Sequence, residues 1–321
     1  MMPEHCFIWP EARFLSRGFR GASPVSPARV ESFLSEMFGN RGVPVVVSSG
    51  RVGLVLALEQ LGIRRVDPVG LFPYASHCVI ESVGRVGSPV CDSSAATMPR
   101  RVIYHQWGYV QEHARGGHIV EDAVDSFCLP SAMLFPAGGD FEVWSLSKLL
   151  GSLGGGVLWC RDEAAAATIR ARRDGRNSLT TLRWLLRLLS RPCPCLVPFW
   201  YGAESLGGAP PGWACGDILS GLREWESIIE ARRRRLAMFL DVLPPWLPRD
   251  DSRLPTAVPV IASESQGQAL VALGFSAGFR HFERVAQTGD RTLLRVFPIP
   301  VHQDVPLRLL DAARRIMLNA N

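Results

Sequence analysis

The amino-acid sequence predicts an α/β fold with a mostly parallel central sheet covered by helices. Short strand-like apolar runs alternate with helix-like runs between about residues 43 and 160, which is the pattern of repeated strand–helix–strand units. The chain also has ordinary globular composition, with 321 residues of which 47% are hydrophobic and 20% are charged. This length is enough for one large domain or two moderate ones.

The runs follow one another in a regular order. "VPVVVSSG" predicts a strand that ends at Gly50, and "RVGLVLALEQLGI" has a helical period, with Leu54, Leu58 and Leu61 on one face. "PVGLFPYAS" predicts a buried strand and a loop, and "CVIESVGRVG" predicts a helix stopped by glycine. Four strand-like runs follow: "RVIYHQWG", "HIVEDAVDS", "FEVWSLSK" and "GGVLWC". Because ligands of such sheets bind at the carboxyl ends of the strands, the residues just after each run are candidate site residues.

Polar residues occupy several of these strand ends. Ser49 and Gly50 open the first helix, where backbone N–H groups suit a phosphate, although Ser49 could be a plain N-cap. His77 lies in the loop after "LFP", where it could stack on a flat ring or cap the next helix. Asp122 and Asp125 follow "HIV", and a carboxylate in an apolar run must be paired because an unpaired buried charge is costly. Its partner could be a protonated ring nitrogen, an arginine or a helix start.

Lys148 ends a later strand-like run and is the only lysine of the chain, since the other 34 of the 35 basic residues are arginine. A guanidinium stays protonated in proteins, whereas an amine can lose its proton and form Schiff bases. A stray surface lysine is the alternative, but such a lysine usually lies among polar residues on a helix face. Lys148 instead lies between Ser145, Ser147 and a glycine run at 154–156, which favours a functional lysine.

A phosphate loop, a stacking residue, a carboxylate and a lysine therefore follow in this order at strand ends. These are the groups that pyridoxal phosphate needs. The lysine binds its aldehyde, and the carboxylate keeps the pyridine nitrogen protonated so that the ring accepts electrons.

Charge and cysteine content argue against other classes of protein. The net charge of +5 is mild, and "RRRR" at 232–235 predicts a solvated helix surface rather than a nucleic-acid site. Residues 182–201 predict an amphipathic helix ended by Pro192, which could pack on the body, on a second subunit or on a membrane surface. No apolar run reaches the length of a membrane span, and the first residues lack the apolar core of a signal peptide. Eight scattered cysteines without a CxxC pair predict a reduced, cytoplasmic protein with no zinc site.

At these motifs the sequence resembles the fold-type I pyridoxal-phosphate enzymes, specifically the DegT/DnrJ/EryC1/StrS family of aminotransferases, which act largely on nucleotide-linked sugars. "SSGRVGLVLALEQLGI" is similar to the family's Ser-Gly-Thr-Ala-Ala-Leu helix opening, "IVEDAVDS" to "IEDAAQA", and "SLSKLLGSLGGGVL" to its lysine loop. "EARRRRLAMFLDVL" and "FPIPVHQD" resemble the start and the end of its small domain. The resemblance implies a large cofactor-binding domain at 1–205, a smaller α+β domain at 206–321, and a homodimer with sites at the interface.

The resemblance also implies roles for individual residues. Lys148 would hold the cofactor, Asp122 would face its ring nitrogen, and His77 would take the ring-stacking place. Asp125 stands where the family usually has glutamine or histidine near the ring hydroxyl, and it would repel an ionised oxygen there unless one of the two groups is protonated. Four residues would lie at or beside the phosphate: Ser49, Gly50, Arg51 and Ser145.

One family motif is missing. "GYNYRMS" provides an asparagine and an arginine near the neighbouring subunit's cofactor phosphate, and "GWACGDI" (Gly212–Ile218) stands in its place. The sequence therefore predicts a pyridoxal-phosphate-dependent aminotransferase of a biosynthetic pathway, whose small-molecule amino donor and keto acceptor are not nucleotide sugars. Two alternatives stay open: an elimination or dehydration enzyme on the same cofactor, and a relative that binds the cofactor without turnover.

Overall fold

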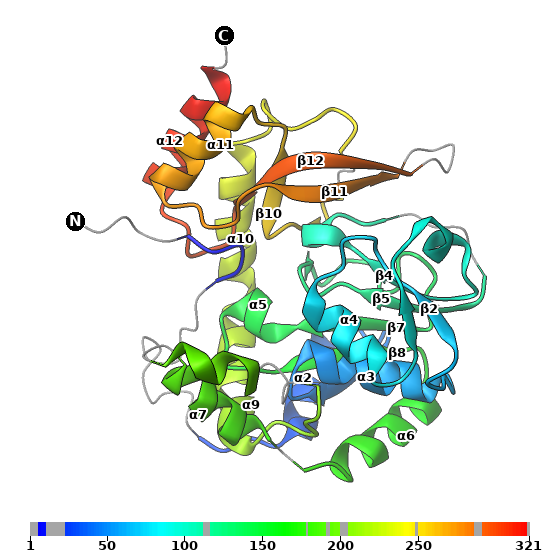
Figure 1. The fold of residues 1–321 in the computed structure, drawn as a ribbon. Helices are drawn as coiled ribbons and strands as arrows, with labels where there is room; N and C mark the ends of the chain where they lie inside the picture. The colour runs from blue at the N-terminus through cyan, green and yellow to red at the C-terminus, as the bar shows by residue number, and fades with distance from the viewer. Residues whose placement is uncertain are drawn as a thin grey trace.

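A seven-stranded sheet lies at the centre of the fold, in the order β1-β8-β7-β5-β4-β2-β3 (Figure 1). The computed structural model describes residues 6–10, 23–111, 116–177, 179–190, 193–199, 205–247, 250–285 and 291–319. The strands are β1 (Val43–Val47), β2 (Pro68–Gly70), β3 (Ser88–Val90), β4 (Arg100–Tyr104), β5 (His118–Asp122), β7 (Phe141–Ser145) and β8 (Gly156–Cys160). Strands β2, β3, β4, β5 and β7 pair in parallel, whereas β8 is antiparallel to both β1 and β7. The predicted α/β fold with a mostly parallel sheet is confirmed.

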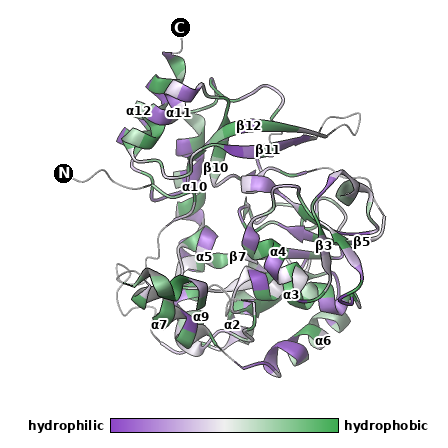
Figure 2. Ribbon diagram, in the orientation of Figure 1, coloured by the Kyte–Doolittle hydropathy of each residue, from purple (hydrophilic) through white to green (hydrophobic). Residues whose placement is uncertain are grey.

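Helices cover both faces of this sheet. They are α2 (Pro27–Met37), α3 (Gly50–Gln60), α4 (His77–Gly84), α6 (Glu163–Asp174) and α9 (Gly212–Arg223), with short 3-10 helices η2 (Ser93–Thr97) and η3 (Gln106–Gly108) in the loops. α3 packs on β7 and β8, and α4 and α6 pack on α3 in turn, so α3 is apolar on nearly every side. α6 forms the outer layer and is largely hydrophilic (Figure 2).

Alternating side chains of the central strands build two cores. Val143 and Leu158 face α3, whereas Trp144 and Trp159 face the opposite layer, which α2 and α9 form. There the ring of Phe38 meets the ring of Trp144 edge to face, with centroids 5.1 Å apart. Such aromatic pairs contribute roughly 0.5–1.5 kcal/mol each beyond the area that they bury.

A second, three-stranded antiparallel sheet lies in the C-terminal part, in the order β10-β12-β11. Its elements are β10 (Ala257–Val260), β11 (Arg280–Val285), β12 (Arg291–Pro300), α11 (Glu264–Leu273) and α12 (Leu307–Leu318). Helix α10 (Trp225–Ala237) runs from the first core to this sheet (Figure 1). The boundary near residue 205 stays a prediction, since residues 200–204 lie outside the described part.

Two polar links join the central sheet to the C-terminal part of the chain. The side-chain amide of Gln106 donates to the backbone oxygen of His281 (2.7 Å) and accepts from the backbone nitrogen of Glu283 (3.2 Å), which docks β11 beside β4. β6 (Phe127–Cys128) pairs with β9 (Arg253–Leu254), where the Arg253 guanidinium lies 2.9 Å from the Glu142 carboxylate. Both charged side chains of this ion pair are buried.

The amphipathic helix predicted at 182–201 corresponds to α7 (Thr180–Leu189), followed by η4 (Pro194–Leu196). Its predicted end at Pro192 lies outside the described residues. Three leucines of α7 are about half exposed: Leu182, Leu185 and Leu189. Within the described residues, no helix is long and apolar enough to cross a membrane.

Candidate active site

The only lysine of the chain lies beside the carboxyl ends of the central strands. β7 ends at Ser145, so Lys148 is carried by the short helix α5 (Leu146–Leu150) rather than by the strand end and loop that the sequence predicts. α5 lies between the central sheet and α10 (Figure 1). Asp122 is the last residue of β5, the neighbour of β7, and Asp125 follows three residues later.

Lys148 forms an ion pair with Asp125, with 3.1 Å between its Nζ and Oδ1 of the carboxylate. Asp125 is fully buried and accepts two further hydrogen bonds, from the indole Nε1 of Trp9 (2.7 Å) and from the hydroxyl of Tyr104. Three donors thus compensate this carboxylate for its loss of water. Burial alone would lower the pKa of Lys148, but Asp125, Cys78 and Asp122 outweigh it and raise that pKa above its ordinary value. Without a ligand, Lys148 is a cation.

Asp122 has a different electrostatic setting from Asp125. Its side chain is buried and accepts from the backbone nitrogen of Val124 at 3.3 Å. Burial raises the pKa of Asp122 to about 6, because the opposing charge of Lys148 does not fully offset the loss of water and Asp125 adds repulsion. Asp122 therefore holds a proton more firmly than an aspartate in water does.

The start of α3 lies against the same place. The Ser49 hydroxyl caps the helix by accepting from the backbone nitrogen of Val52 at 3.2 Å, so the N-cap interpretation of Ser49 is confirmed. A Cβ atom added at Gly50 would lie 3.2 Å from Val124 and 3.4 Å from the Cβ of Ser145. The first turn of α3, the loop after β5 and the end of β7 thus meet closely. Arg51, the second residue of the helix, is half-buried.

His77 lies at the first turn of α4. It is exposed, and Ser76 rather than His77 occupies the N-cap position. The next residue, Cys78, acts on the pKa of Lys148, so this end of α4 is close to the lysine. The hydroxyl of Ser145 lies 3.1 Å from that of Ser147, on the strand and helix that lead to Lys148.

Sequence reasoning missed three residues around the lysine: Trp9, Tyr104 and Arg232. Arg232 was predicted to lie on a solvated helix surface, and this is wrong because its side chain is fully buried. Its Nη2 donates to the backbone oxygen of Leu149 (3.1 Å), and its Nε donates to Gln303, whose own amide donates to the same oxygen (3.1 Å). α10 and Gln303 therefore hold α5 next to Lys148.

The sequence indicates the positions of these three residues to different degrees. Arg232 follows Trp225, Ile228 and Ile229 at helical spacing, which places it on the buried face of α10. Tyr104 ends β4 and belongs to the same set of strand ends as Asp122. Trp9 has no such signal, because it lies outside the periodic segments.

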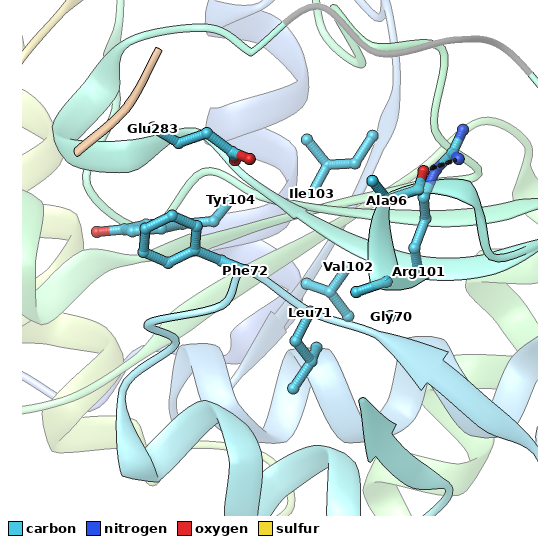
Figure 3. Close-up of a pocket in the computed structure, with 10 residues that line it drawn as sticks. Gly70, Leu71, Phe72, Ala96, Arg101, Val102, Ile103, Tyr104 and Glu283 are labelled. Atoms are coloured by element: carbon cyan, nitrogen blue, oxygen red, sulfur yellow. Dashed lines mark hydrogen bonds between the residues drawn. The ribbon is translucent and has the colours of Figure 1, made fainter. Parts of the chain in front are cut away.

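A small pocket lies beside this cluster, between β2, β4 and β11 (Figure 3). Phe72 and Glu283 line one end, with the Glu283 carboxylate pointing inward, and Arg101 lies at the other end. Tyr104 lines the pocket as well, but its hydroxyl points away from it to Asp125. Lys148 does not line the pocket. We therefore take the converging polar groups, rather than this hollow, as the candidate active site.

Solved structures share this fold over nearly their whole length. An aminotransferase from Streptoalloteichus hindustanus, TlmJ, has a TM-score of 0.64 at 18% identity, covering 98% of this chain and 97% of that one. A sugar aminotransferase from Micromonospora echinospora has a TM-score of 0.62 at 18% identity, covering 100% of both chains. A GDP-4-keto-6-deoxymannose-3-dehydratase has a TM-score of 0.61 at 15% identity, covering 98% and 99%. At these identities the matches show the fold, and it is the expected fold-type I fold.

The family membership of the chain follows from its amino-acid sequence. A comparison with curated proteins gives no match. A family model described as "Putative PLP-dependent aminotransferase" matches residues 30–311, where PLP stands for pyridoxal phosphate. This match covers most of the chain and includes Lys148 and both carboxylates. The chain therefore belongs to this family of pyridoxal-phosphate-dependent aminotransferases, and its cofactor is pyridoxal phosphate.

Proposed function

We propose that Lys148 holds the cofactor and that the chain transfers an amino group between a small-molecule amino donor and a keto acceptor. The observation that carries this proposal is the convergence of the only amine side chain of the protein with two buried carboxylates at one edge of the sheet. Pyridoxal phosphate, when bound, supplies an aldehyde that carries the amino group and a ring that accepts electrons. The residues of the chain must bind it, orient it and move protons.

The donor set fits the three polar parts of this cofactor. The Lys148 amine fits the aldehyde, and Asp122 fits the ring nitrogen, because a buried carboxylate with a raised pKa gains most from a cationic partner. The first turn of α3 brings backbone N–H groups, the Ser49 cap and the Arg51 side chain to this edge of the sheet, and the start of a helix suits a phosphate. Gly50 leaves space where a Cβ would crowd Val124.

The remaining roles follow from position. Asp125 pairs with the Lys148 ammonium and would lie near the ring hydroxyl of the bound cofactor. His77 is exposed at the start of α4, next to Cys78, and would be suited to stack on the ring. Ser145 lies beside Gly50 in the turn that would hold the phosphate. Lys148, once released, is a base suited to move a proton at the substrate carbon that bears the amino group.

A borohydride experiment tests the attachment site. Reduction in the presence of pyridoxal phosphate should fix the cofactor on the peptide that contains Lys148, and no other side-chain amine of the chain competes. Lys148→Arg is the matched control, because arginine keeps the charge opposite Asp125 but forms no imine. Cofactor fixed on the N-terminal amine, with Lys148 unmodified, would refute the proposal.

A second candidate function is elimination or dehydration. It is favoured by the Asp125 carboxylate beside Lys148, at a position where the family that the sequence resembles usually has glutamine or histidine, and by a dehydratase among the proteins of the same fold. The half-reaction separates the alternatives. An amino donor added without a keto acceptor should convert the bound cofactor to its amine form and abolish its visible absorption. An elimination enzyme would instead release ammonia and restore the absorption, and a non-catalytic relative would leave it unchanged.

We also propose a cytoplasmic homodimer that acts on small substrates. The exposed leucines of α7 support an apolar contact with a second copy. The "GWACGDI" segment forms the start of α9, and its Asp217 is buried and accepts from the backbone nitrogen of Leu153 (3.1 Å), so this segment offers no cation for a diphosphate. A side-by-side assay of keto-sugar nucleotides and small keto acids tests the substrate, and efficient amination of a keto-sugar nucleotide would overturn this preference.

A further inference from the structure

The N-terminal segment 6–10 brings one aromatic ring to the lysine. Its backbone is held by the C-terminal part of the chain, with Cys6 donating to the backbone oxygen of Gly274 (2.9 Å) and His302 Nε2 lying 3.0 Å from the oxygen of Phe7. Cys6 and Pro10 are buried, whereas Trp9 is 37% exposed. The indole of Trp9 nevertheless turns back to the central sheet.

The Trp9 ring makes two contacts with the charged pair of the site. Its Nε1 donates to Oδ1 of Asp125 at 2.7 Å, the same oxygen that the Lys148 ammonium contacts at 3.1 Å. The Lys148 Nζ also lies over the ring, 4.3 Å from its centroid, which is the geometry of a cation–π interaction. The ammonium is thus held between a carboxylate and the face of an indole.

We propose that Trp9 is a positioning residue for Lys148, and that the Trp9 ring and the Asp125 carboxylate together form a holding site for the free ammonium of that lysine. The proposal rests on the proposed function, since Lys148 needs such a site only if it alternates between the cofactor and a free state. A free lysine amine of an aminotransferase must stay close to the reacting carbon, because a proton carrier acts only within hydrogen-bond reach. The holding site keeps Lys148 there after its release.

Other titratable groups also act on this lysine or on its partner Asp125. Asp122 lies at the end of β5, Cys78 on α4, and the guanidinium of Arg232 on α10 acts on Asp125. Tyr104 is the third donor to Asp125. These groups stay in place when Trp9 is changed, so their effects cancel when Trp9 variants are compared with the unchanged protein.

The absence of other lysines gives a direct measurement. The rate of acetylation of Lys148 in the cofactor-free protein, followed by mass spectrometry as a function of pH, reports the pKa of this one side-chain amine. Trp9→Leu keeps an apolar group of some bulk but removes the aromatic face, so the ammonium loses stabilisation. We expect the pKa of Lys148 to fall by about half a pH unit or more, the size of a partly buried cation–π contact. Trp9→Phe keeps an aromatic face and should leave the pKa within about a few tenths of a pH unit of its original value.

Two controls make the result decisive. Tyr104→Phe removes another donor to Asp125 and no ring over the lysine, so it should not lower the pKa of Lys148 as Trp9→Leu does. Circular dichroism checks that each variant is folded, and Trp9→Met, which also lacks an aromatic face and should lower the pKa in the same way, replaces Trp9→Leu if that variant unfolds. An unchanged or raised pKa in folded Trp9→Leu, or an equal fall in Trp9→Phe, would overturn the holding site. Because no cofactor is present, this failure is distinct from a failure of the borohydride experiment.

Discussion

Replacing Asp122 with asparagine should stabilise the cofactor-free protein at neutral pH. Asp122 is 4% exposed, and burial raises its pKa from the ordinary value of 3.8 to about 6. The folded state therefore holds the proton more tightly than the unfolded chain does. The resulting stabilisation is fully present below about pH 4, falls as the pH rises to about 6, and is lost above that.

The size of this effect follows from the two pKa values. Their difference is about 2 pH units, and at about 1.4 kcal/mol per unit it corresponds to a loss of about 3 kcal/mol at neutral pH. The asparagine amide carries no charge and avoids this loss. Asp122→Asn should therefore raise the free energy of unfolding by up to about 3 kcal/mol at about pH 7, and by almost nothing at about pH 4.

Urea denaturation of both proteins across this pH range measures the difference. Asp125→Asn is the matched control, because Asp125 accepts from three donors and its loss should destabilise the fold. Saturating pyridoxal phosphate should reverse the order, since only the original carboxylate pairs with a ring cation and ligand binding stabilises the folded state. A gain that does not change with pH, or a loss at neutral pH, would refute the reasoning about burial.

Two further predictions concern charged pairs. Asp125→Asn should lower the pKa of Lys148 by about 1–3 pH units, because it removes the opposite charge 3.1 Å away. The rate of Lys148 acetylation as a function of pH measures this change. An unchanged pKa would mean that Asp125 does not control the lysine. Glu142→Gln should lower the free energy of unfolding by about 3–5 kcal/mol, because it leaves the buried Arg253 guanidinium without its carboxylate. Urea denaturation measures this change, and a decrease in the free energy of unfolding below about 1 kcal/mol would contradict the prediction.

The sequence predicts the central fold and the main polar groups of the site because both follow from regular patterns. Strand–helix alternation implies a parallel sheet, and parallel strands bring their carboxyl ends to one edge. Asp122 and the loop with Asp125 are found this way. Lys148 is found by its rarity, although it lies on a short helix after the strand rather than at its end.

The side-chain contacts between these groups cannot be predicted from the periodicity of the sequence. Which carboxylate pairs with Lys148 depends on side-chain directions in the loop after β5, and strand spacing does not define them. Trp9 and Asp125 are 116 residues apart, and no local period relates them. Arg232 lies within a run of four arginines, where composition indicates a solvated surface but helical spacing from Trp225 indicates the buried face.

The charges around Asp125 explain how a second carboxylate fits beside Asp122. Asp125 lies opposite the Lys148 ammonium, and the buried Arg232, whose pKa burial lowers to about 9, keeps its charge at neutral pH and also acts on Asp125. Asp122 lacks such compensation, so it holds a proton up to about pH 6, and at neutral pH a cation beside it would stabilise its charged form. The ring nitrogen of pyridoxal phosphate would be that cation. With the cofactor bound, Trp9 and Tyr104 would still donate to Asp125, and the ring hydroxyl of the cofactor would be a further possible donor to this carboxylate. An acid at this position is therefore compatible with the cofactor, provided that its donors are retained.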